Sequence, residues 1–71
     1  MIRKFIQGKL YKVTYPEHPY NDGFIVMPLH LRNDMYEVGY SRWDIIQLCP
    51  KTKQILFLDD RVLRYNLYVE A

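Results

Sequence analysis

The sequence predicts a small all-β domain, or a β-rich one with a single short helical turn. Strand-forming residues, including seven tyrosines, run almost from end to end of the 71-residue chain. Clusters of proline, glycine, asparagine and aspartate divide them into short segments, as turns do in an antiparallel meander. The length allows one hydrophobic core, so residues 1–71 are expected to form a single domain.

The first strand is expected at residues 9–15. In this segment, KLYKVTY, tyrosine and valine alternate with lysine and threonine, which is typical of a strand with one buried face. Residues 15–24, YPEHPYNDGF, indicate a loop. Pro16 and Pro19 remove two backbone donors, and the NDG sequence before Phe24 favours a turn.

A hairpin is expected around Asn33-Asp34, between strands at residues 24–32 and 35–40. That register gives one face three apolar pairs: Leu31 with Tyr36, Leu29 with Val38, and Met27 with Tyr40. On the other face His30 is opposite Glu37. Pro28 lacks a backbone donor, so it indicates an edge strand or a bulge.

Residues 41–49, SRWDIIQLC, allow two interpretations. Ser41 followed by Asp44 resembles a helix-capping pair and favours a short helix. The apolar run that leads into Cys49-Pro50-Lys51-Thr52, a type I turn sequence, instead favours a tight turn at 41–44 followed by a strand. We favour the turn and strand, and we expect the next strand at QILFL, residues 54–58.

A last hairpin is expected around Asp59, Asp60 and Arg61, between QILFL and VLRYNLYV. A four-residue loop places Ile55 and Phe57 on the face opposite Leu58, and a three-residue loop reverses that choice. Either register leaves apolar side chains on both faces of the sheet.

A flat sheet with two apolar faces has to curl or be covered. The five or six short strands are therefore expected to curl into a small barrel. In size and strand rhythm it resembles SH3-like and OB-like barrels.

The charge is mildly basic, with ten Lys and Arg against eight Asp and Glu, a net charge of +2 and both signs mixed along the chain. The longest apolar run has six residues and contains Pro28, far short of the ~20 needed to cross a bilayer. No secretory h-region follows the start. Because Cys49 is the single cysteine, a reducing cytoplasm is the expected location.

No pattern in the sequence indicates catalysis, a cofactor or a metal. The soft and imidazole metal donors are only His18, His30 and Cys49, fewer than a zinc site needs. Cys49 is expected to be a small buried hydrophobe beside a turn. Asp59 and Asp60 are neighbours that point to opposite faces of an extended segment, so they are expected to be solvated turn residues.

Binding of another protein is the function that the sequence favours, with the chain acting as a small inhibitor or adaptor. Tyr, Trp and Arg, which dominate interface energetics, gather in the first loop and near residues 40–43. The other interpretation of Trp43 is that it anchors the core. The candidate partner-binding residues are Tyr15, His18, Tyr20, Asp22, Tyr40, Arg42 and Trp43.

Two other functions remain open. A small barrel can bind single-stranded nucleic acid on aromatic rings edged by basic groups. The candidates for that surface are Lys9, Lys12, Lys51, Lys53, Arg61 and Arg64 with Tyr11, Tyr65 and Tyr68. Sequestration of a small ligand such as a nucleotide is the second alternative. The core is small, so a partner protein or a second copy of the chain would add stability. Small free-standing proteins of this kind are also familiar from phages.

Overall fold

A computed structural model describes residues 2–14 and 23–71 of the chain. These residues form one antiparallel sheet of five strands in the order β4-β3-β2-β1-β5, which confirms the all-β prediction. The described part of the chain contains no helix that is long and apolar enough to cross a bilayer. In chain order the elements are β1 (Tyr11–Val13), β2 (Ile25–Met35), the 3₁₀ turn η1 (Tyr36–Val38), β3 (Tyr40–Cys49), β4 (Gln54–Arg64), the 3₁₀ turn η2 (Tyr65–Leu67) and β5 (Tyr68–Glu70).

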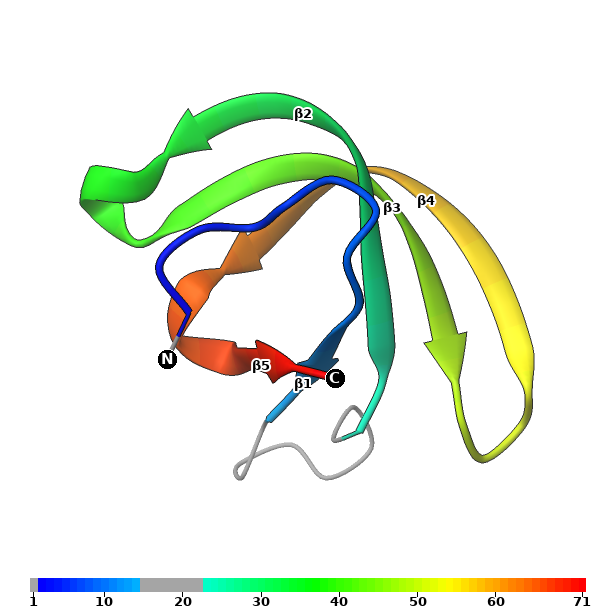
Figure 1. Cartoon of the computed structure of the whole chain (residues 1–71). Helices are drawn as coiled ribbons and strands as arrows, with labels where there is room; N and C mark the ends of the chain where they lie inside the picture. The colour runs from blue at the N-terminus through cyan, green and yellow to red at the C-terminus, as the bar shows by residue number, and fades with distance from the viewer. Residues whose placement is uncertain (1, 15–22) are drawn as a thin grey trace.

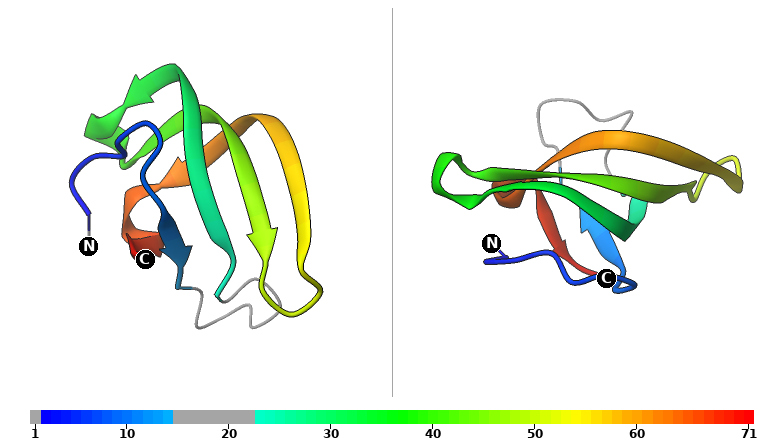
Figure 2. Two further views of the ribbon diagram at one scale, coloured as in Figure 1. Left: turned by 45° about the vertical axis from the view of Figure 1, so that its right-hand side comes forward. Right: turned by 90° about the horizontal axis from the view of Figure 1, so that it is seen from above.

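The sheet is strongly curved. The long strands β2, β3 and β4 arch over a second layer that contains β1, β5 and the N-terminal segment (Figures 1 and 2). β5 returns to pair with β1, with Tyr11 opposite Glu70. No described strand joins β4 to β5, so the sheet is open and closure into a barrel is not confirmed.

The hydrophobic core lies beneath the arch, and its centre is aromatic. The ring of Phe5 stacks on Tyr65 at 5.0 Å between centroids, and it meets Tyr11 edge-on at 4.9 Å. Both arrangements are favourable for aromatic quadrupoles. The buried core residues are Phe5, Tyr11, Val13, Val26, Trp43, Ile45, Leu63 and Tyr65.

Phe5 reaches the core because hydrogen bonds hold the N-terminal segment against the sheet. The amide of Ile6 donates to the Tyr11 hydroxyl at 2.8 Å, and the amide of Gly8 donates to the carbonyl of Pro28 at 2.8 Å. A segment without regular secondary structure thereby supplies the central core ring.

The first predicted hairpin exists, but its predicted turn is wrong. β2 continues through Asn33-Asp34 to Met35, and the chain reverses over η1 and Gly39. Gly39 adopts φ 90°, a left-handed conformation that glycine enters without a Cβ clash. The Asp34 carboxylate accepts the amide of Tyr36 at 3.1 Å and so begins the turn instead of forming its tip.

Because the chain turns at residues 36–39 and not at Asn33-Asp34, every cross-strand pair predicted for that hairpin is wrong. Leu31 lies opposite Trp43, and His30 lies opposite Asp44 instead of Glu37. Pro28 lies beside a bulge in β2, as its missing donor indicated, because Leu29 is an extra residue between paired positions 28 and 30.

Residues 41–44 form neither the predicted tight turn nor the alternative helix, because β3 runs unbroken from Tyr40 to Cys49. The Ser41 hydroxyl accepts the indole N–H of Trp43 at 2.8 Å and therefore caps no helix. The turn expected after Cys49 is present over residues 50–53, where the amide of Lys53 donates to the Cys49 carbonyl at 2.8 Å.

The hairpin predicted at residues 59–61 is also wrong. β4 extends through them to Arg64, and the chain changes direction at η2. Asp59 and Asp60 together oppose Asp44, which is the pattern of a β-bulge. Asp60 has φ 53°, a conformation that aspartate tolerates better than most residues.

We predict that Phe5→Ala destabilises the protein by about 3–5 kcal/mol, because it opens a cavity at the centre of the core. Ile6→Ala is the matched control. Ile6 is the next residue and is 54% exposed, so its truncation should change the free energy of unfolding by about 0.5 kcal/mol or less. Urea denaturation followed by tyrosine and tryptophan fluorescence measures both. Equal effects of the two variants would contradict the central place of Phe5.

Candidate functional site

The predicted partner-binding residues do not form one cluster in the described structure. Tyr15, His18, Tyr20 and Asp22 lie outside the described residues. Tyr40, Arg42 and Trp43 lie on β3.

Trp43 is a core residue, with 6% of its surface exposed. The interpretation that it anchors the core is therefore the one that the structure shows. Arg42 forms an ion pair with Asp60, and Tyr40 is half-buried with the Arg64 guanidinium 5.7 Å from its ring centroid. Tyr40 and Arg42 remain accessible to a partner, although both already have intramolecular contacts.

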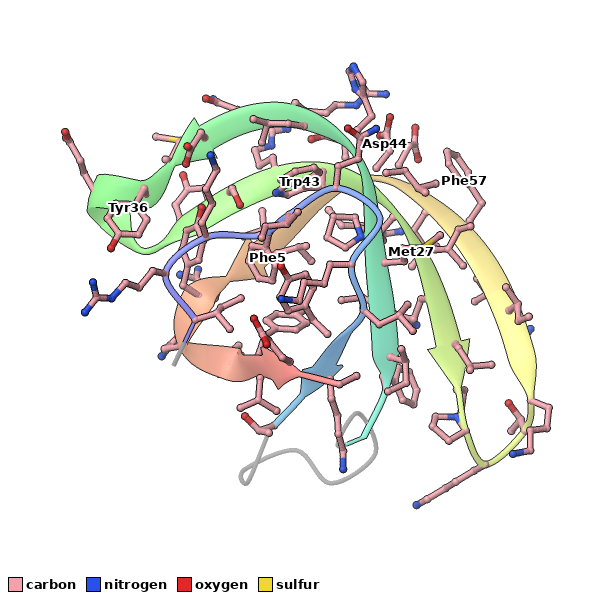
Figure 3. The ribbon with its side chains drawn as sticks, viewed as in Figure 1. Phe5, Met27, Tyr36, Trp43, Asp44 and Phe57 are labelled. Carbon is pink, nitrogen blue, oxygen red and sulfur yellow. The ribbon has the colours of Figure 1, made fainter. Side chains whose placement is uncertain are left out.

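The side chain of Asp44 accepts three hydrogen bonds from the two strands beside it. It lies at the crest of the curved sheet, where β2, β3 and β4 bend together (Figure 3). Arg32 donates to it through Nε at 2.8 Å and Nη2 at 3.2 Å, in a bidentate geometry. The amide of Asp60 donates to the same carboxylate at 3.0 Å, and His30 Nδ1 lies 3.8 Å from it.

These donors lower the pKa of Asp44 below its ordinary value. The hydrogen bond from Arg32 is the largest cause, followed by the hydrogen bond from the Asp60 amide. A carboxylate that is ionised and surrounded by donors has no proton to donate and few free lone pairs. The Asp44 cluster therefore fits a structural role at the bend better than acid–base chemistry.

Other polar groups are dispersed. No group of three or more His, Cys, Asp and Glu side chains with metal-binding geometry occurs in residues 2–14 and 23–71. Cys49 is half-buried instead of fully buried, and a hydrogen bond with the Thr52 side chain lowers the pKa of its thiol.

Two of the three tyrosines expected to bind nucleic acid are buried. Tyr11 and Tyr65 are core residues, and Tyr68 is partly buried against them. Bases stack only on accessible ring faces, so Tyr11 and Tyr65 cannot stack on bases while the core is folded.

The outer, convex face of β2, β3 and β4 carries an apolar surface near the β3–β4 turn. Residues that pair across an antiparallel sheet share a face, so the register defines two rows. Met27, Ile46 and Phe57 form one row, and Ile25, Leu48 and Ile55 form the next. We call these six residues the outer patch.

The outer patch is accessible to solvent. Ile55 and Phe57 are 66% and 64% exposed, and the other four residues are half-buried. Phe57 projects from the side of the sheet opposite Phe5 and Trp43 (Figure 3). Contiguous apolar side chains on a sheet face are typical of interaction surfaces, whereas single exposed ones are ordinary.

Charged groups border the outer patch on two sides. Lys12 pairs with Ile25 and extends the second row onto β1. Lys51 lies beside Ile25 and Lys12 around a shallow hollow at the β3–β4 turn. At the other end, toward the crest of the sheet, lie Asp44 and its partners. The patch therefore has a basic border near the turn and a mixed one at the crest.

The sequence did not identify the outer patch as a site, although it contained a signal for it. Ile55 and Phe57 alternate with Leu56 and Leu58, so one pair had to face away from the core. Ile46 and Leu48 alternate in the same way on β3. The prediction of apolar groups on both faces of the sheet is confirmed, but the two rows depend on bulges that cannot be located from residue spacing.

Comparison of the chain with protein-family models, curated proteins and solved structures finds no match. The candidate site consequently depends on the geometry of this chain alone.

We predict that Asp44→Asn lowers the melting temperature at pH 7 by about 5 °C or more, because it weakens the bonds that hold the bend. The folded-state pKa of Asp44 is lowered, so its stabilisation is complete above the ordinary carboxyl pKa near 4. It is lost as the pH falls through the lower folded-state value.

Thermal melts from pH 7 to pH 2 test this. The difference between wild type and Asp44→Asn should be constant above about pH 5 and should narrow below about pH 4. Glu37→Gln, which changes an exposed carboxyl on η1, is the control and should follow the wild type. A difference that does not depend on pH would contradict the role of the ionised carboxylate.

Proposed function

We propose that this chain is a non-enzymatic protein-binding module that acts as a small inhibitor or adaptor by occupying a partner's surface. The observation that carries the proposal is the outer patch: the folded chain leaves Ile55 and Phe57 about two-thirds exposed beside four further apolar side chains.

The energetics support a partner of protein character. Complete burial of a Phe or Ile side chain contributes about 1.5–3 kcal/mol. Ile55 and Phe57, on the edge strand of the patch, are therefore enough to act as the hot spot of an interface. The patch lies on paired strands, so its backbone needs little ordering when it binds.

The surroundings of the patch indicate the chemistry of the partner. Lys12 and Lys51 border it near the β3–β4 turn, so we expect an apolar partner surface edged by acidic groups. Arg42, beyond the crest on β3, is a candidate for the rim of the same interface, whereas Tyr40 lies beside η1, and its role in binding stays a prediction. For Tyr15, His18, Tyr20 and Asp22 a role in binding stays a prediction.

We propose that the curved sheet is a small SH3-like or OB-like barrel that is incompletely closed. The return of β5 to β1 and the curl of β2–β4 over them support an SH3-like arrangement that is open between β4 and β5. Cys49 as the single cysteine supports action in a reducing cytoplasm.

We predict that Phe57→Ser weakens partner capture about 30-fold, because it removes the most exposed aromatic anchor of the patch. Ile55→Ser should act in the same direction. Val38→Ser is the matched control, since Val38 is 61% exposed but lies on η1 at the far end of the hairpin. Affinity capture from a nuclease-treated lysate of the encoding organism, followed by titration of the captured protein, measures the effect.

Two outcomes would contradict the proposal. The first is equal loss of capture with Phe57→Ser and Val38→Ser when circular dichroism shows both folded. The second is retention of the wild type on single-stranded DNA that falls steeply with salt, which is the signature of phosphate contacts.

A further inference from the structure

The free edge of β4 differs from ordinary sheet edges. The only described strand that pairs with β4 is β3, so the other side of residues 54–58 carries unpaired backbone groups. Soluble proteins protect such edges with charges, proline, bulges or short length. Residues 54–58, QILFL, contain none of these devices.

The opposite edge of the sheet is protected, and so is the second half of β4. β5 has only three residues, and Lys9 forms an ion pair with Glu70 at its end. Beyond Leu58, β4 carries the bulge at Asp59 and Asp60. The unprotected stretch is therefore confined to five residues, and it contains Ile55 and Phe57, the two most exposed members of the outer patch.

We infer that this edge pairs antiparallel with the same edge of a second copy of the chain, around a two-fold axis at Leu56. In that register, Ile55 lies opposite the partner's Phe57, and Phe57 lies opposite the partner's Ile55. Pairs of an aromatic and a β-branched residue are among the favourable cross-strand combinations. Both pairs stay on the outer face, because an antiparallel register centred on a residue keeps each face intact.

Charge complementarity and the length of the paired stretch favour this register over its neighbours. With the axis at Leu56, residues 54–58 of the two copies pair, and Lys53, the last residue of the β3–β4 turn, comes level with the partner's Asp59 at each end. An axis at Phe57 sets Lys53 against the partner's Arg61 and Ile55 against the partner's Asp59. An axis at Ile55 brings Asp59 level with the partner's Lys51, but it sets Lys53 against the partner's Phe57 and leaves only the strand residues 54–56 of each copy paired.

The small size of the contact sets its strength. Five residues from each copy are far fewer than the roughly 20–30 residues a side of a standard stable interface. The expected complex is a reversible dimer with a Kd on the order of 0.1 mM. Pairing brings the two outer patches together across the axis, and this inference does not depend on what those patches bind.

Sedimentation equilibrium between 10 µM and 1 mM at low salt tests the inference on the full chain. The wild type should shift reversibly from monomer to dimer over this range. Lys53→Glu places two carboxylates opposite each other at each end of the contact, and Asp59→Lys places two ammonium groups there. Because like charges repel, each variant should weaken the dimer about tenfold. The double variant Lys53→Glu/Asp59→Lys restores both pairs and should return to the wild-type Kd.

Lys4→Glu is the control, because it makes the same change of charge as Lys53→Glu but lies beside β5 at the other edge of the sheet. It should dimerise like the wild type. A wild type that stays monomeric at 1 mM would overturn the inference. A dimer whose Kd is the same in the wild type, Lys53→Glu and Asp59→Lys would overturn it as well. Partner capture that Phe57→Ser leaves unchanged, while dimerisation still depends on the charges at 53 and 59, would instead reject only the proposed function.

Discussion

The carboxylate of Asp44 is the constraint on which the rest of the structure depends. It joins the Arg32 side chain on β2 to the backbone of Asp60 on β4, from its own place on β3. The pairing of β2 with β3 and the pairing of β3 with β4 both change register around this point. Bulges increase local twist and bend the strands. A buried charge that satisfies donors on both neighbouring strands can hold such a bend, because leaving any of these polar groups unpaired would be costly.

The bend divides the apolar residues into two groups. Phe5, Trp43 and their neighbours lie under the arch, where the N-terminal segment completes a small aromatic core. Ile55 and Phe57 lie on the outside, and no other part of the described chain covers them. A larger domain could cover that face with another layer. In the described part of this chain, no such layer covers the outer face.

The all-β class, the alternation of Tyr11 and Val13, and the turn after Cys49 could be predicted from local sequence. Local sequence could not exclude a turn at Asn33-Asp34. The observed turn depends on the left-handed conformation of Gly39 and on the hydrogen bond from the Tyr36 amide to the Asp34 carboxylate. Likewise, the local sequence around Asp44 and Asp60 is typical of a helix cap and a turn, although in the fold the Asp60 amide donates to the Asp44 carboxylate. Hydrogen bonds between residues distant in sequence determine the conformation at Asp44 and Asp60, and residue spacing does not predict such bonds.

The pairing of Tyr11 with Glu70 has a consequence for the order of folding. β2, β3 and β4 pair with their neighbours in sequence, so only short loops have to close before these hairpins form. β1 and β5 lie at opposite ends of the sequence of strands, and closing the long loop between them costs more chain entropy. We therefore expect the lower layer, in which Phe5 contacts Tyr65 and Tyr68, to close after the meander has formed.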